Sequence, residues 1–292
     1  MALATALPGA AVAIRATRGK FQDAASAQAW VAVGGASVER LRGRRLVYFN
    51  GAFSPPTLAH AHIITAIAQD SEVDVVWLDP EPARPGKLRW LDETLVARME
   101  MCERMVEDAD LGDIAGVGTL RRDLGAELGT SAELFRTLRA LLGGPGQGHI
   151  TWALGADVLE GMQHWAEKAQ CCLRPGDTCD GLLLFTRGDW TEQRLLDAAV
   201  AVLGEKGDCE VRILPMPAAL TAISSHDARR ALAPAALGGL LSQQDLDRSM
   251  SPGVAQLCLA RPGVCRVYAE QVAATPLQPS RSKGRGDQRA RL

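Results

Sequence analysis

The chain alternates between two patterns of hydrophobic and polar residues from about residue 45 to about residue 260. Short, nearly continuous apolar runs rich in β-branched residues are typical of buried strands, and longer segments with apolar residues three or four positions apart are typical of amphipathic helices. The first pattern predicts strands over residues 45–50, 73–78, 113–118, 149–154, 181–186 and 210–215. The second pattern predicts helices over residues 58–70, 93–108, 131–142, 156–169, 190–204 and 226–233.

The order of these elements favours one fold class. Strands and helices alternate, as they do in a parallel sheet covered by helices, and the nearly continuous apolar strands indicate burial on both faces of that sheet. We therefore expect an α/β protein with a doubly wound, mainly parallel sheet and helices on both faces. Ligands of such sheets bind beyond the carboxyl ends of the strands, so the segments that follow the strands are where we look for chemistry.

Composition fits one folded domain, which we assign to residues 41–270. The 292 residues are 47% hydrophobic, enough for one sizeable core. A formal net charge of −2 gives no overall basic field, which argues against nucleic acid and anionic lipid as partners.

No apolar run approaches the roughly 20 residues of a membrane span, so we expect a soluble protein, and the sequence leaves a homo-oligomer open. Seven cysteines lack zinc-type spacing, so reduced thiols and no directly held metal ion are expected.

The two ends of the chain differ from its middle. Residues 1–40 form an N-terminal extension, whose first 22 residues contain three basic residues and no acidic one. That bias is typical of an organelle transit peptide, but the segment is poor in serine, so a plain Ala-rich extension is the other interpretation. We accordingly expect the protein in the cytoplasm or nucleus, or in a plastid or mitochondrion if the segment is a transit peptide. Residues 271–292 end in a basic stretch that indicates a disordered tail.

The segment after the first expected strand combines the features of an anion site. The sequence GAFSPPTLAH (residues 51–60) leads from the strand through Gly51 and two prolines to a helix that Thr57 is suited to cap. Glycine lets the backbone approach a ligand closely, and a helix N-terminus presents unpaired N–H groups and a positive dipole end to phosphate. Thr57 and His60 are three residues apart on one helix face, so both are expected to point at the same ligand.

A second segment of this kind follows the expected strand over residues 149–154. Gly155 stands at the turn, and Asp157 is suited to cap the next helix. By itself, Trp165 is interpreted as a core aromatic.

A third segment, ISSHDARRAL, follows the last expected strand. Ser224 and Ser225 stand at a helix start with Arg229 just inside it, which offers hydroxyls, N–H groups and positive charge to a phosphate. An ordinary capped, solvated helix is the other interpretation.

The first segment resembles the signature of the HxGH nucleotidyltransferases. The pattern of that superfamily is G-x-F-x-P-x-[H/T]-x-x-H, which Gly51, Phe53, Pro55, Thr57 and His60 match. The resemblance implies a Rossmann-like nucleotidyltransferase fold in which His60 contacts the reacting phosphates.

The other two segments narrow the resemblance to one family. GADVL, followed by a tryptophan, is similar to the nicotinamide/nicotinate mononucleotide adenylyltransferases. In this family the aspartate, here Asp157, lies near the nucleotide, and the tryptophan, here Trp165, stacks on the pyridine ring. The third segment is similar to the family's I-S-S-T-x-[IL]-R, which places Ser224, Ser225 and Arg229 at the triphosphate of ATP.

Some further matches and departures accompany these motifs. The loop PARPGK resembles a family loop whose lysine, here Lys87, reaches phosphate, and Arg98 and Met101 match an R-x-x-M helix. His226 stands where the family has threonine, and Ala228 stands where it has a larger aliphatic residue.

The resemblance implies an enzyme that joins ATP to nicotinamide or nicotinate mononucleotide, releasing pyrophosphate, with Mg²⁺ bound mainly through the ATP phosphates. His60, Thr57, Arg229 and Lys87 are the expected catalytic residues. Another nucleotidyltransferase, such as one acting on pantetheine phosphate, and a degenerate nucleotide-binding or interaction protein are the alternatives. The sequence does not decide between the amide and the acid mononucleotide.

Overall fold

The computed structural model describes residues 41–82, 93–118, 120–123, 131–162, 171–204 and 208–274. Two of the expected site residues, Lys87 and Trp165, lie outside the described residues, as do the N-terminal extension and residues 275–292. Every structural statement below concerns the described part of the chain.

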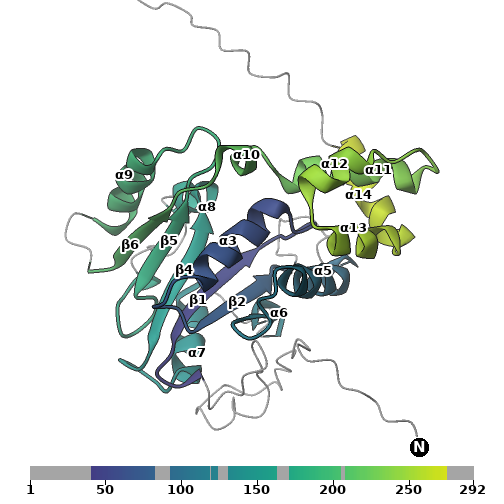
Figure 1. Ribbon diagram of the computed structural model, residues 1–292. Helices are drawn as coiled ribbons and strands as arrows, with labels where there is room; N and C mark the ends of the chain where they lie inside the picture. Colours follow the sequence, from purple (N-terminus) through teal and green to yellow (C-terminus); the bar gives the residue numbers. More distant parts are fainter. Residues whose placement is uncertain are drawn as a thin grey trace, which may run out of the picture.

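Six parallel strands form one sheet at the centre of the molecule (Figure 1). The strand order is β3-β2-β1-β4-β5-β6, so all six expected strands are present and the predicted doubly wound sheet is confirmed. The chain moves outward from β1 to β3 and then returns to β4 on the other side of β1, which places the change of direction between β1 and β4. The strand bounds are β1 Arg45–Gly51, β2 Val75–Pro80, β3 Ala115–Val117, β4 His149–Gly155, β5 Gly181–Phe185 and β6 Glu210–Leu214.

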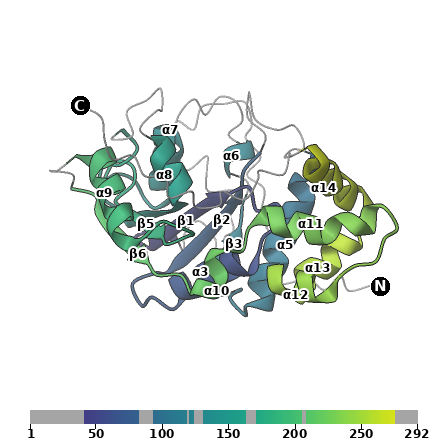
Figure 2. The ribbon, with the colours of Figure 1, turned by 90° about the horizontal axis from the view of Figure 1, so that it is seen from above.

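Helices cover both faces of this sheet, as expected. Alternate residues of β1 show the division, because Tyr48 packs into the core on one face and Phe49 into the core on the other. Figure 2 shows α7 and α8 on one face and α3 on the opposite face. The six expected helices are α3 Leu58–Ala68, α5 Leu95–Asp108, α7 Ser131–Leu141, α8 Ala156–Met162, α9 Glu192–Leu203 and α11 Ser225–Ala236.

Several helices were not predicted. Two are single turns, and three form the end of the described chain, where they pack with α5 and α11 beside the sheet (Figure 1). The last helix ends at Ala274, four residues past the expected end of the domain at residue 270, and its fully buried Tyr268 anchors it in the core. The bounds are α6 Leu120–Asp123, α10 Ala218–Thr221, α12 Gln243–Ser249, α13 Pro252–Leu259 and α14 Pro262–Ala274. No helix in these ranges is long and apolar enough to cross a membrane.

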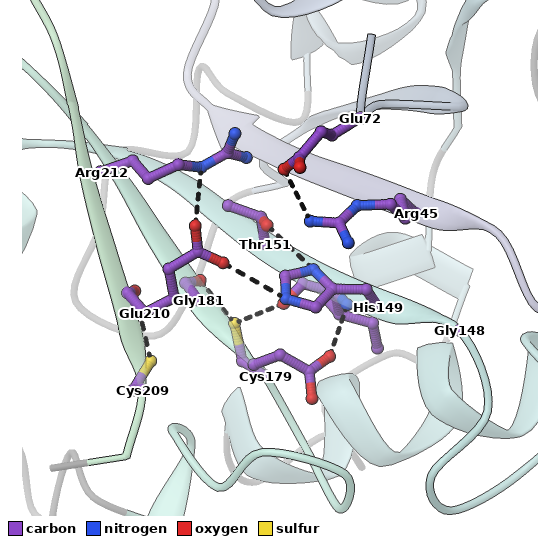
Figure 3. Close-up of polar contacts among 12 residues, drawn as sticks. Arg45, Glu72, Gly148, His149, Thr151, Cys179, Gly181, Cys209, Glu210 and Arg212 are labelled. Carbon is purple, nitrogen blue, oxygen red and sulfur yellow. Dashed lines mark hydrogen bonds and ion pairs between the residues drawn. The ribbon is translucent and has the colours of Figure 1, made fainter. Parts of the chain in front are cut away.

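Charged side chains connect the amino ends of the strands, at the edge opposite the segments singled out above (Figure 3). The His149 ring lies 3.6 Å from Glu210, which also lies 3.4 Å from Arg212. Arg45 lies 3.1 Å from Glu72. These partly exposed ion pairs contribute little individually, so we assign them to the tethering of the strand ends rather than to chemistry.

Candidate active site

The β1–α3 turn (residues 51–57) lies at the carboxyl end of the central strand, beside the change of strand direction. Phe53 occupies the left-handed region with a φ of 41°, which is uncommon for a residue other than glycine. Its buried ring packs edge to face against Phe49 and His60, with centroid separations of 5.2 and 5.1 Å. The turn is therefore held in an unusual backbone conformation by a side chain inserted beneath it.

Four backbone carbonyls of this turn accept hydrogen bonds from other parts of the chain. The bonds are Glu81 N–H to Gly51 O (2.8 Å), Arg98 Nη1 to Ala52 O (2.5 Å), Arg229 Nη1 to Ser54 O (2.6 Å) and Ser225 Oγ to Pro55 O (2.9 Å). In a trans peptide the N–H points opposite to the carbonyl. Because the Gly51 and Ala52 carbonyls face these donors, the N–H groups of Ala52 and Phe53 face the other way, as an anion site requires.

His60 has a defined proton arrangement. Its Nδ1 accepts a hydrogen bond from the Thr57 backbone N–H at 3.0 Å and lies 2.9 Å from the Thr57 hydroxyl, so Nδ1 is unprotonated and the ring proton is on Nε2. Burial, together with the positive charge of Arg187, lowers the pKa of His60 to about 3. His60 is thus a neutral imidazole with one N–H to donate. Thr57 is the N-cap, as predicted, but its buried side chain faces the imidazole rather than a ligand.

A cavity that is partly open to solvent lies beside His60. Its walls come from α3, from the end of β5 and from the segment between β6 and α11, and include Ile63, Phe185, Arg187, Met216 and Leu220. A mostly apolar cavity with a few polar groups in its wall is typical of a small-molecule site. None of these five wall residues was identified from the sequence, although Arg187 has a recognisable signal, since it is a charged residue two positions after the end of the buried strand β5.

The third segment lies against the β1–α3 turn, through the Ser225 and Arg229 bonds described above. Ser224 caps α11, accepting a bond from the Asp227 N–H at 3.2 Å and donating one to the Asp227 carboxylate at 2.5 Å. Burial, with help from Arg230 and Arg229, lowers the pKa of His226, which favours its neutral form. Ala228 is fully buried, so the position at which this small residue replaces the family's larger aliphatic residue lies in the core.

The second segment joins the same edge of the sheet. Gly155 ends β4, and a Cβ there would lie 2.7 Å from the Asp157 carboxylate, so a side chain at this position would displace Asp157. Asp157 is exposed and is the second residue of α8 rather than its N-cap, which differs from the expected capping role. Glycine permits the Asp157 carboxylate to fold back over the strand end beside Phe185.

A network of buried polar side chains at the same strand ends was missed by the sequence analysis. Trp152 Nε1 donates to Asn50 Oδ1 at 2.7 Å, and Asn50 Nδ2 donates to Glu81 Oε1 at 2.6 Å. Deeper in the sheet, the Tyr48 hydroxyl donates to fully buried Asp79 at 2.7 Å, and burial raises the pKa of Asp79 to about 7. The sequence feature that could have revealed this network is a polar residue, Asn50 or Asp79, near the end of an otherwise apolar strand.

The chain is similar to several known proteins. The cytidylyltransferase-like family model matches residues 48–183. A probable nicotinate-nucleotide adenylyltransferase of Agrobacterium fabrum is 26% identical over 168 residues, which cover 54% of this chain and 84% of that protein.

Solved structures have the same fold. The Plasmodium falciparum nicotinic acid mononucleotide adenylyltransferase complexed with APC aligns with a TM-score of 0.58 at 15% identity, covering 76% of this chain and 97% of that one. The same enzyme complexed with NaAD aligns with a TM-score of 0.52 over the same shares of both chains. The family-model match and the curated relative agree with the resemblance to the nicotinamide/nicotinate mononucleotide adenylyltransferases that the sequence motifs indicate, and the solved structures show the same fold.

Proposed function

We propose that the protein transfers the adenylyl group of ATP to the phosphate of nicotinate or nicotinamide mononucleotide, forming a dinucleotide and releasing pyrophosphate. The observation that carries this proposal is the neutral His60, oriented by Thr57 at the N-terminus of α3 and bordering the cavity. The A. fabrum relative and the P. falciparum structures support the choice of a pyridine mononucleotide as the acceptor.

The cavity supplies a place for ATP. Its apolar side chains, Phe185, Met216 and Leu220, suit the adenine ring, and its polar side chains, His60 and Arg187, suit the phosphates. A triphosphate that extends from these polar side chains reaches the N-terminus of α3 and the N–H groups of the β1–α3 turn, where the helix dipole favours negative charge.

The chemistry needs no protein nucleophile. A phosphate oxygen of the mononucleotide attacks the α-phosphorus of ATP, a new P–O bond forms, and the bond to the β-phosphate breaks with its electron pair leaving on pyrophosphate. The protein contributes alignment of the two phosphates and donors for the charge that develops on them. We propose that His60 Nε2–H donates to an oxygen of the α-phosphate and that the N–H groups of the turn supply further donors.

Mg²⁺ would neutralise part of the charge on the ATP phosphates. Within the described ranges no group of three or more His, Cys, Asp or Glu side chains is arranged to hold a metal ion. We propose that the Mg²⁺ arrives on ATP and keeps most of its water ligands. The exposed Asp157 is the acidic side chain on α8 nearest the strand ends, and would bind a metal-bound water or a ribose hydroxyl.

The acceptor is proposed to bind next to Asp157, with Trp165 stacking on the pyridine ring and Lys87 reaching a phosphate. Ser224 and Arg229 are proposed to bind the triphosphate on the side opposite His60. In the structure the Ser224 hydroxyl is engaged with Asp227, so binding of a phosphate there requires this hydroxyl to turn.

One observation favours a second candidate, a protein that binds nucleotide without turnover. The Asp227 carboxylate lies against Ser224 at the N-terminus of α11, where negative charge opposes a bound phosphate. A single assay distinguishes this candidate from an active enzyme.

The assay supplies purified protein with ATP, Mg²⁺ and either mononucleotide, and measures pyrophosphate and dinucleotide. We expect turnover with at least one of the two, and pantetheine phosphate serves as the control acceptor. Nucleotide binding without product from either mononucleotide would exclude the proposed function and favour the second candidate. Product from pantetheine phosphate alone would redirect the assignment to another acceptor.

A further inference from the structure

Arg98 is a fully buried arginine on α5, close to the site but outside the cavity. Its Nη1 donates to Ala52 O at 2.5 Å, its Nη2 donates to Glu81 O at 2.8 Å, and its Nε donates to the Thr94 hydroxyl at 3.1 Å. Burial of a guanidinium costs free energy unless its N–H groups make hydrogen bonds, and the Arg98 guanidinium donates the three hydrogen bonds given above.

The two carbonyls belong to different loops. Ala52 lies in the β1–α3 turn, and Glu81 is the residue after β2. Glu81 also bonds directly to β1, because its N–H donates to Gly51 O at 2.8 Å and its carboxylate accepts from Asn50 at 2.6 Å. Arg98 therefore joins the two loops that leave the neighbouring strands β1 and β2 at the carboxyl edge of the sheet.

The contact with Ala52 determines how one peptide group is oriented. The carbonyl of Ala52 points toward Arg98, so the N–H of Phe53 points away from it, toward the side of the turn proposed to receive phosphate. The same peptide precedes Phe53, whose φ of 41° needs support from its surroundings and whose ring packs on His60. Loss of the Arg98 bond would release this peptide and the ring beneath His60.

We propose that Arg98 is a positioning residue for adenylyl transfer, holding the β1–α3 turn in the orientation that aligns its N–H groups and His60 with the α-phosphate. This inference rests on the proposed function. Arg98 touches neither the cavity wall nor the reacting atoms, so its loss lowers the rate of the chemical step more than it weakens binding of the adenine ring. Lysine cannot replace it, because a single ammonium lacks the planar fork that reaches two carbonyls and a hydroxyl at once.

Arg139 on α7 provides a matched control at the opposite edge of the sheet. It is also buried, it donates to the carbonyls of Gln147 at 2.8 Å, Gly148 at 3.1 Å and Thr178 at 2.9 Å, and it pairs with the Asp180 carboxylate at 2.5 Å. Arg139→Lys therefore disturbs buried contacts with backbone carbonyls, as Arg98→Lys does, without touching the site. A structural effect alone would make the Arg98 and Arg139 variants alike.

The test compares Arg98→Lys with Arg139→Lys in thermal stability, in kcat and KM for both substrates, and in amide hydrogen exchange of residues 45–60. We expect both variants to lose stability, and only Arg98→Lys to lose kcat, by ~10²-fold, the scale of a misplacement of about 1 Å. Its KM for ATP should stay within about threefold of the wild-type value, because the adenine wall is unchanged. Exchange over residues 45–60 should accelerate in Arg98→Lys alone.

Two further arms keep the outcome decisive. If Arg98→Lys does not fold, Thr94→Val removes the acceptor of Arg98 Nε at constant shape and should lower kcat in the same direction. Unchanged kcat in a folded Arg98→Lys, or unchanged kcat in Thr94→Val when Arg98→Lys does not fold, would overturn the positioning role. If the wild-type protein forms no product, the proposed function fails by itself, and the exchange comparison then decides whether Arg98 orders the turn.

Discussion

The Thr57 backbone N–H and the His60 Nδ1 atom are 3.0 Å apart, and this hydrogen bond determines which ring nitrogen of His60 carries the proton. The donor is a main-chain group, which no side-chain substitution at residue 57 other than proline removes. The tautomer of His60 is therefore a property of the helix N-terminus rather than of one neighbouring side chain. The remaining nitrogen, Nε2, is the one left for a ligand.

Replacement of His60 by alanine is expected to lower kcat by ~10²-fold or more, the scale of losing one preorganised donor in a closed site. Steady-state kinetics with ATP and the preferred mononucleotide measure the effect. His62→Ala is the control, because His62 lies on the same helix and is not among the residues that line the cavity. Equal activity of the His60 and His62 variants would remove His60 from the mechanism.

Stability should fall in acid partly because of His60. The folded protein takes up a proton on His60 only near pH 3, whereas the unfolded chain does so near the ordinary value of 6.5. Between these values the unfolded state binds more protons, so the free energy of unfolding decreases as the pH falls from about 6.5 toward 3. Thermal midpoints of wild type and His60→Gln over this range test the claim, and the wild type should show the steeper loss. Parallel curves would contradict the low pKa.

Asp79 should have the opposite pH dependence. Its pKa is about 7 in the folded protein and near the ordinary 3.8 in the unfolded chain, so the folded state keeps its proton longer and stability falls as the pH rises between these values. Asp79→Asn replaces a carboxyl that loses its proton with a neutral side chain of the same shape. We expect the thermal midpoint of the variant, relative to that of the wild type, to be higher at pH 8 than at pH 5.

The control for that change is Asp180→Asn. Asp180 accepts hydrogen bonds from Arg139, from the Ile150 N–H and from the Gly176 N–H, so three donors surround its carboxylate in the folded protein. Asp180→Asn should lower the midpoint at both pH values. A midpoint for Asp79→Asn that falls at pH 8 as far as that of Asp180→Asn would refute the protonated state of Asp79.

Filling the cavity should affect ATP selectively. Leu220 forms part of its wall, and Leu220→Trp places a larger ring in the space proposed for adenine. We expect the KM for ATP to rise by about tenfold or more, with the KM for the mononucleotide little changed. Ile223, also on the wall, carries the backbone carbonyl that accepts a bond from Arg187, and Ile223→Val is a mild control that keeps the cavity open. A larger change in the mononucleotide KM would place the acceptor in this cavity instead.

The strands and their parallel arrangement were predictable because burial on both faces leaves nearly continuous apolar runs, as in VVWLDP of β2. The helices at the end of the chain were not. Helix α12 is mostly polar and buries only Leu246 and Ser249, and α13 begins with a Pro-Gly pair that resembles a turn. Helix α11 continues to Ala236, beyond the expected end at residue 233, with Pro234 inside it.

The anion-binding turn was predictable because its residues are adjacent in the sequence, so Gly51, Thr57 and His60 form one local pattern. The residues that hold the turn were not, because each acts across a long sequence separation. Arg98 and Glu81 meet the turn from two other elements, and Arg187 reaches the cavity from the end of β5. Single-sequence patterns carry no direct information about such contacts.

The same separations have a consequence for how the protein is made. Ser225 and Arg229 bond to carbonyls of the β1–α3 turn that precede them by 170 and 175 residues. On the ribosome the turn therefore emerges long before the α11 side chains that bond to it, and a nascent chain that has completed only β1, β2 and α5 contains the signature with the Arg98 and Glu81 contacts but without those from α11. Competence to bind nucleotide should appear late in synthesis, once α11 has emerged and docked, rather than when the signature itself becomes available.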